Sequence, residues 1–227
     1  MDFIFDVSGL TKEDDEFTDS KKDVLKYLKI IGVDTRFISY TPSKIYINNL
    51  RFSKFSKKRQ ETFKKQYPNI EVIRNSLFQK ICSKSSKTLA DIKPNSRILV
   101  PKDNFMTDII LEPYTRKYGV KLVTEGEYDL IVNPVILDDE INQIFSTIFS
   151  CEGLEFGKKD NEIYPLINVP LDWINSILEM DGHEKIKNEN NDELASSFMV
   201  FLEDVAPQYR ENVLKASEYI ENRLEVK

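Results

Sequence analysis

The stretch RILVPKDNFMTDIILEPYTRKYGVKLVTEGEYDLIVNPV, residues 97–135, predicts how this chain folds. Its apolar runs RILVP, KLVTE and YDLIVNPV are short and rich in Val, Ile and Leu, as is typical of buried strands. A helical segment, residues 104–118, separates the first two runs and ends at Gly119, and Pro113 is expected to break it. Strands that alternate with helices predict an α/β fold with a mostly parallel sheet and helices on both faces.

The alternation continues on both sides of this stretch. We expect strands at residues 3–9, 35–48 and 70–74. We expect helices at residues 18–32, 54–68, 76–90 and 137–150. An extended segment follows at 162–170, and further helices close the chain. These patterns predict an α/β domain over residues 1–170 and a C-terminal helical module over residues 171–227.

Composition narrows the class of protein. The chain has 227 residues, 41% of them hydrophobic and 31% charged, which is typical of a soluble globular protein. No apolar run is long enough to span a bilayer, and the first residues do not resemble a signal peptide. We therefore expect a cytoplasmic protein without a membrane partner.

Two cysteines and one histidine limit the chemistry that this chain can perform. Cys82 and Cys151 are far apart and cannot form a disulfide scaffold or a four-cysteine zinc site within one chain. We interpret each cysteine as a small buried apolar residue. We expect His183 to be a solvated loop residue, so a hydrolase triad is excluded and no metal site is predicted.

Charge is divided unevenly along the chain, although the net charge is only −6. Residues 44–102 contain 15 Lys or Arg and three acids, a balance of +12, whereas residues 1–43 carry −3 and residues 103–227 carry −15. Like charges repel, so a basic segment of this kind indicates a polyanionic partner. The alternative is that the basic third lies against the acidic thirds of the same chain.

The densest part of the basic segment is RFSKFSKKRQETFKKQY, residues 51–67. Its cations could neutralise phosphates, and its aromatic residues could stack on unpaired bases. The predicted RNA-binding cations are Arg51, Lys54, Lys57, Lys58, Arg59, Lys64 and Lys65. The aromatic residues among them are Phe52, Phe55, Phe63 and Tyr67. Alternatively, these aromatic residues form the core side of a basic helix.

The turn after the first predicted strand contains polar groups that could bind an anion. Ser8 and Gly9 leave the strand, and Asp19 and Ser20 open the following helix. Backbone N–H groups at such a helix N-terminus can bind a phosphate. Four consecutive acids, residues 13–16, oppose this unless Mg²⁺ lies between them and the phosphate. The alternative is a solvated acidic loop.

These fragments resemble the PP-loop ATP pyrophosphatases, the adenine nucleotide alpha-hydrolase-like fold. VSG at 7–9 and DS at 19–20 resemble the family loop SGGxDS, split by an acidic insertion. NPVILDDEINQIFSTIF at 133–149 and EIYPLINVPLDWINSIL at 162–178 resemble segments of the tRNA-modifying branch, which includes 2-thiolation enzymes and tRNA lysidine synthase. A competing register places the loop at residues 103–108, where every signature residue is replaced.

The resemblance implies a function in tRNA modification, in which a base is adenylated with ATP and Mg²⁺ before thiolation or amination. It implies these site residues: Asp19 and Asp139 as catalytic, and Ser8, Gly9, Ser20 and Asp138 as nucleotide-binding. The second loop glycine is absent and the loop is acidic, so the signature is degenerate. The resemblance also allows a non-enzymatic subunit that supports a catalytic PP-loop partner, or a homodimer.

Overall fold

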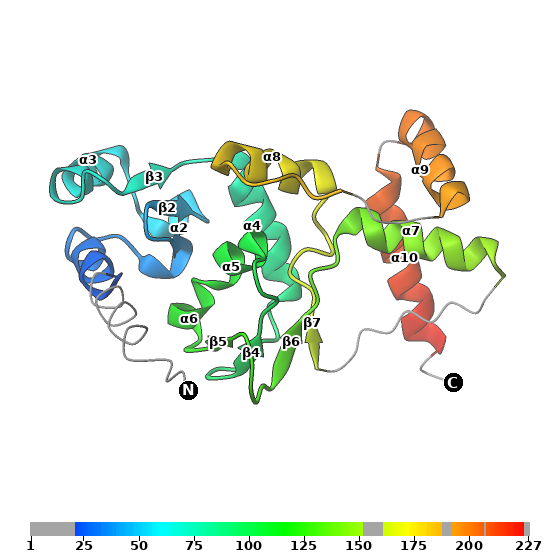
Figure 1. Cartoon of the computed structure of the whole chain (residues 1–227), viewed down its shortest axis with the longest axis horizontal. Helices are drawn as coiled ribbons and strands as arrows, with labels where there is room; N and C mark the ends of the chain where they lie inside the picture. Colours follow the sequence, from blue (N-terminus) through cyan, green and yellow to red (C-terminus); the bar gives the residue numbers. More distant parts are fainter. Residues whose placement is uncertain (1–20, 152–160, 188–191, 207, 225–227) are drawn as a thin grey trace, which may run out of the picture.

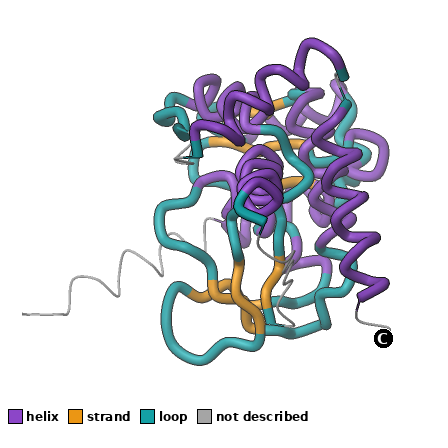
Figure 2. Tube along the Cα trace, turned by 90° about the vertical axis from the view of Figure 1, so that its right-hand side faces the viewer, coloured by secondary structure: helices purple, strands orange, loops and turns teal. Residues whose placement is uncertain are grey.

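The computed structural model describes residues 21–151, 161–187, 192–206 and 208–224 (Figure 1). The described strands form two sheets, one with the order β1-β2-β3 and one with the order β5-β4-β6-β7. Figure 2 shows these strands in two separate groups. The strand predicted at residues 3–9 lies outside the described residues.

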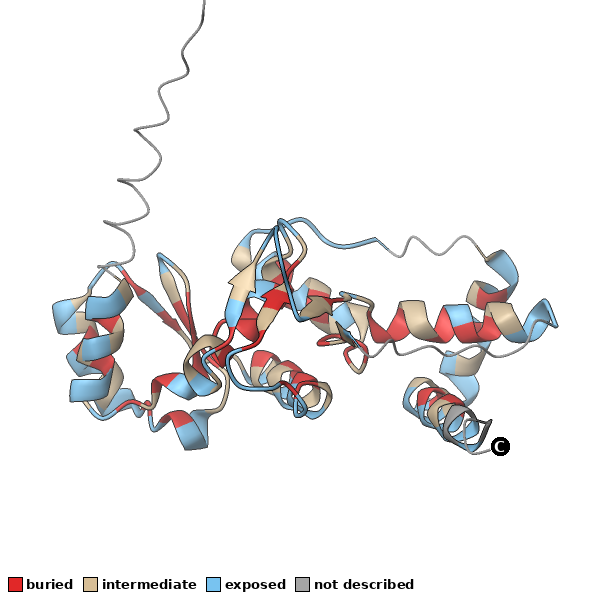
Figure 3. Cartoon of the chain, turned by 90° about the horizontal axis from the view of Figure 1, so that it is seen from below, coloured by how far each residue is buried: buried red, intermediate tan, exposed pale blue. Residues whose placement is uncertain are grey.

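The N-terminal lobe, residues 21–74, is built on the three-stranded sheet. Its elements are a helix through residues 21–30, η2 (Thr35–Phe37), β1 (Ile38–Tyr40), β2 (Lys44–Ile47), α2 (Leu50–Ser53), α3 (Lys57–Gln66) and β3 (Glu71–Ile73). β2 pairs with β1 antiparallel and with β3 parallel. Figure 3 shows exposed residues on the outer side of these helices and buried residues between them. The helix predicted at 54–68 is confirmed over a shorter range.

The central lobe, residues 75–135 and 161–187, contains the four-stranded sheet. Its strands, β4 (Arg97–Leu99), β5 (Lys121–Val123), β6 (Leu130–Val132) and β7 (Glu162–Ile163), are all parallel. Its helices are α4 (Ser76–Thr88), α5 (Phe105–Leu111), α6 (Tyr114–Lys117) and α8 (Leu171–Asp181). The break predicted at Pro113 is confirmed, since it separates α5 from α6. The α/β class with a parallel sheet is confirmed.

Three helices form a C-terminal bundle beyond the sheet (Figure 1). They are α7 (Leu137–Phe149), α9 (Glu193–Val205) and α10 (Tyr209–Leu224). Ile141 and Ile144 of α7 pack with Met199 of α9 and Leu214 of α10 in a core of their own. Among the described helices, none combines the length and the apolar character that crossing a bilayer requires. The division at residue 170 stays a prediction.

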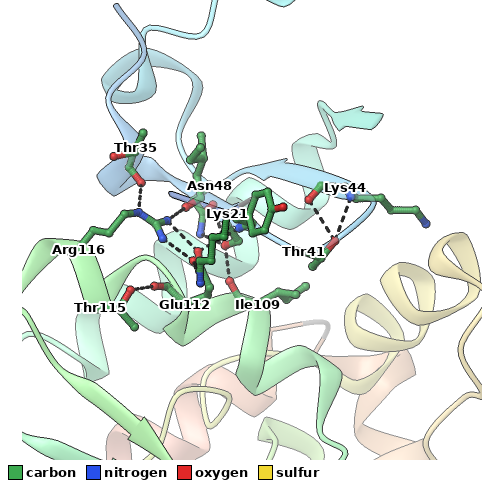
Figure 4. A network of polar contacts seen from close by, with 12 residues as sticks. Lys21, Thr35, Thr41, Lys44, Asn48, Ile109, Glu112, Thr115 and Arg116 are labelled. Carbon is green, nitrogen blue, oxygen red and sulfur yellow. Dashed lines mark hydrogen bonds and ion pairs between the residues drawn. The ribbon is translucent and has the colours of Figure 1, made fainter. Parts of the chain in front are cut away.

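The ion pair of the buried Glu112 and the half-buried Arg116 lies at the junction of the first two lobes (Figure 4), where Tyr46 also packs into the central core. β1 is an edge strand, so its outer N–H and C=O groups have no strand partner. The backbone N–H of Tyr40 donates to Glu112 at 3.0 Å, and Arg116 donates to the carbonyl oxygen of Ile38 at 2.7 Å. Lys21 adds an ion pair to Glu112 at 3.0 Å. The pair therefore attaches the central lobe to the edge of the N-terminal sheet.

The same contacts determine how Glu112 titrates. Burial of its carboxyl opposes ionisation, but the hydrogen bond and charge of Arg116, with Lys21 and the Tyr40 N–H, outweigh burial and lower the pKa of Glu112 below 4.5. A carboxyl whose pKa is lowered in the folded state stabilises the fold above its unfolded pKa. That stabilisation is lost as the pH falls through the folded pKa.

We predict that Glu112→Gln lowers the free energy of unfolding by about 3 kcal/mol at pH 7, because the half-buried Arg116 is left without its charge partner. Urea unfolding at pH 7 and pH 3 measures this, and the difference from wild type should shrink at pH 3. Glu125→Gln, in an exposed loop, is the control and should change little. An equal loss at both pH values would contradict the charge-based explanation.

Candidate nucleic-acid interface

The corner between α2 and α3 is shaped by three local backbone features. The Asn49 side chain accepts a hydrogen bond from the Phe52 N–H at 3.0 Å and caps the first turn of α2. Lys54 ends α2 in the left-handed conformation, with φ 55°. Ser56 then caps α3 by accepting from the Arg59 N–H at 3.3 Å. The chain therefore turns sharply, and residues from both helices form one surface.

The cationic surface consists of the seven predicted RNA-binding residues on and between α2 and α3. Five of them are exposed: Arg51, Lys54, Lys57, Lys58 and Lys65. Arg59 and Lys64 are half-buried. Across the described ranges, none of the seven forms an ion pair. Asp34 lies near Lys54, whose charge helps to lower the pKa of Asp34, and Glu61 lies within α3, so the cluster keeps a net positive charge that favours an anionic ligand.

Other cations of the basic segment are neutralised by the acidic part of the chain. The ion pairs are Lys44–Asp181, Lys84–Glu211 at 2.7 Å and Arg97–Glu127 at 3.0 Å. Each joins a base from residues 44–102 to an acid from residues 103–227. Within the described residues, the intramolecular alternative therefore holds for these three bases, whereas the cationic surface forms no such ion pair.

Most of the aromatic residues in this stretch serve the core. Phe55 and Phe63 are completely buried, and their rings meet edge to face at 6.0 Å. Tyr67 is half-buried and stacks on Phe63 at 5.2 Å. Of the two alternatives for these aromatic residues, the core one holds for Phe55 and Phe63, because their rings are buried and cannot stack on bases. Phe52 differs, since it is 53% exposed.

Arg59 has a structural role within the cationic surface. Its guanidinium donates to the carbonyl oxygen of Lys54 at 2.5 Å, which closes the corner before α3. It also lies over Gly32, where an added Cβ would come within 2.8 Å of the guanidinium. Gly32 has φ +83°, so a side chain there is disfavoured for two reasons. A contact of Arg59 with RNA stays a prediction.

The turn at residues 103–108 follows β4 at the carboxyl edge of the parallel sheet. β4 lies between β5 and β6, the point of such a sheet where ligands commonly bind. The Asn104 side chain accepts a hydrogen bond from the Thr107 N–H at 3.0 Å. The Phe105 ring contacts the His183 ring in a tilted arrangement, with ring centroids 4.1 Å apart. Partial burial and the charge of Asp103 raise the pKa of Asp108. This turn contains neither a glycine nor a cation, and its residues do not fit a nucleotide phosphate.

The two aspartates at the start of α7 differ in their surroundings. Asp138 is buried, accepts a hydrogen bond from the Leu171 N–H at 2.6 Å and pairs with Arg210 at 3.1 Å. It therefore joins α7 to α8 and α10. Asp139 is half-buried on the first turn of α7. Nucleotide contact by Asp138 and catalysis by Asp139 stay predictions.

The remaining predicted site residues, Ser8, Gly9, Asp19 and Ser20, lie outside the described residues. In the described part of the chain, no group of three or more His, Cys, Asp or Glu side chains could hold a metal ion.

The cysteines and the histidine complete the comparison with the sequence. Cys82 is half-buried on α4, and burial raises the pKa of its thiol far above the usual range. Cys151 is exposed, so its prediction as a buried residue is wrong. His183 is exposed, and its ring lies 3.3 Å from the Asp181 carboxylate. Because its pKa is raised, the thiol of Cys82 is a poor nucleophile.

Comparison with solved structures finds a likeness to the U34-tRNA thiolase NcsA from Methanococcus maripaludis with its 4Fe-4S cluster. The TM-score is 0.45 and the identity 13%, over 68% of this chain and 82% of that chain. At these values the likeness carries no functional assignment. No protein-family model matches the chain. No curated protein matches it.

We predict that two neighbouring aromatic residues respond differently to truncation. Phe63→Ala should lower the free energy of unfolding by about 3–5 kcal/mol, because it opens a cavity in the core under α3. Phe52→Ala should change it by less than about 1 kcal/mol, because the ring is largely exposed. Urea unfolding measures both. Similar losses for the two variants would contradict the distinction between a core ring and a surface ring.

Proposed function

We propose that this protein binds RNA through the cationic surface of α2 and α3. The observation that supports this is the unpaired charge of the cluster in a protein whose net charge is −6. Holding seven cations together is unfavourable unless a polyanion neutralises them and releases its counterions. Exposed lysines suit phosphates, which supply affinity without reading sequence.

The finer proposal is that the RNA is tRNA and that the protein acts in tRNA modification. It rests on the sequence resemblance to tRNA-modifying PP-loop proteins, carried by Asp138, Asp139 and the Pro165–Leu166 pair. In those proteins ATP with Mg²⁺ activates the base. The described residues after β4 do not fit a phosphate, and Asp138 is engaged by Leu171 and Arg210. We therefore propose RNA binding as the function and derive no nucleotide step.

A second candidate function is that of an interaction subunit, and one observation favours it. Leu194, Phe201 and Val205 on α9 are 59–62% exposed and follow a helical spacing of seven and four residues. Such an apolar stripe on a charged protein is suited to protein contact. If it mediates a homodimer, light scattering should show an assembly that Phe201→Glu converts to monomers. A monomeric wild-type protein would contradict the homodimer.

We predict that Lys57, Lys58 and Lys65, changed together to Glu, lower the affinity for an unmodified tRNA transcript at least about tenfold. The loss of three phosphate contacts should also make the slope of log affinity against log salt shallower, by about 2 in total. Fluorescence anisotropy at several salt concentrations measures both quantities.

The matched control reverses three exposed lysines away from the cationic surface, Lys121, Lys187 and Lys215. It makes the same change in net charge. If both triple variants weaken binding equally, the effect is one of overall charge and not of this surface. If the α3 variant binds tRNA like the wild type, the proposed function is wrong.

A further inference from the structure

A cleft of about 340 Å³ lies between the N-terminal and central lobes, beside the cationic surface. Phe37 of η2 and Phe52 of α2 line it from the N-terminal lobe, while Ser83 of α4 and Tyr114 and Lys117 of α6 line it from the central lobe. Its volume is in the range of about 300–1,000 Å³ that is usual for small-molecule sites. It is therefore large enough for one planar group.

The lining combines aromatic rings with positive charge. The rings of Phe37 and Phe52 lie 5.3 Å apart, and the Lys117 ammonium lies 5.1 Å from the ring of Tyr114. The guanidinium of Arg36 lies 6.0 Å from the Phe37 ring but is paired with Asp34 at 2.8 Å, so the unpaired positive charge of the lining comes from Lys117. No acidic residue is among the described residues that line the cleft. The cleft thus attracts an anion and offers it aromatic surface.

Polar groups in the cleft are available for directional recognition. Within the described ranges, the Ser83 hydroxyl makes no hydrogen bond and Lys117 forms no ion pair. Asn48 and Asn49 also line the cleft, but the Asn48 carboxamide is hydrogen-bonded to Ser39 and the Asn49 side-chain carbonyl oxygen accepts from the Phe52 N–H. Hydroxyl and amide groups can pair with the edge of a nucleobase, while its flat face stacks on an aromatic ring. Cys82, which is half-buried, also lines the cleft, and the raised pKa of its thiol makes it poorly reactive, which favours binding over chemistry.

We propose that this cleft binds one unpaired nucleobase of an RNA strand whose phosphates lie on the cationic surface. Phe52 connects the two features, since it lines the cleft and follows Arg51, whose guanidinium lies 5.9 Å from its ring. The inference rests on the proposed function, because the phosphates deliver the base to the cleft. It adds a preference for unpaired over paired RNA, which cations alone do not provide.

The test uses two RNA probes, a single strand of about 12 nucleotides with one 2-aminopurine and a fully paired duplex of the same length, both followed by fluorescence. Phe52→Ala should weaken single-strand binding about tenfold or more, and leave duplex binding unchanged. Ser83→Trp fills the cleft from the opposite lobe and should act in the same way. Tyr128→Ala, another exposed aromatic residue, is the matched control.

Each outcome distinguishes this inference from the proposed function. If the wild type binds neither probe, the proposed function fails. If the lysine variant loses both probes while Phe52→Ala and Ser83→Trp bind the single strand like the wild type, RNA binding stands and the base site is wrong. Displacement of the 2-aminopurine strand by free ATP, with loss of that competition in Ser83→Trp, would assign the cleft to a mononucleotide instead.

Discussion

The pair of Glu112 and Arg116 satisfies the free edge of β1 and, together with the packing of Tyr46 into the central core, holds the two sheets in their arrangement. An edge strand that is buried without partners would leave donors and acceptors unsatisfied, at a cost of about 1–3 kcal/mol each. Here a carboxylate receives the Tyr40 N–H and a guanidinium reaches the Ile38 carbonyl. One ion pair therefore replaces a missing strand and joins the lobes without continuing the sheet.

The short helix α6, which carries Arg116, also contributes to the proposed base site. Arg116 of α6 reaches β1, while Tyr114 and Lys117 of α6 line the cleft. The distance between the walls of the cleft is thus set by the contact that holds the lobes together. A change that loosens Glu112 would alter the cleft without touching any residue that lines it. The stability of the lobe junction and the geometry of the cleft are therefore coupled through α6.

The sequence predicts what depends on local pattern and misses what depends on distant partners. Pro113 lacks the backbone N–H that a helix needs, whatever surrounds it, so the division between α5 and α6 could be predicted. The strands form two sheets, and β2 pairs with β3 in the first of them. This division depends on long-range packing, which a local sequence pattern does not encode. The sequence leaves open whether Phe55 and Phe63 face bases or the core, and the structure places both rings in the core although Phe55 precedes α3. Asp138 of α7 similarly pairs with Arg210 of α10, which is distant in sequence but lies in the same C-terminal bundle.

The unequal fate of the basic residues is the strongest argument about function. Lys44 and Lys84 meet acids because α8 and α10 pack beside them, so their charge is explained by folding alone. α3 lies at the opposite end of the molecule from α9 and α10 (Figure 1), and the acids of those helices do not compensate it. The repulsion among the cations of α3 therefore remains in the folded protein. Among the described residues no ion pair neutralises that cluster, and an RNA strand would supply both the phosphates that neutralise it and a base for the aromatic cleft beside it.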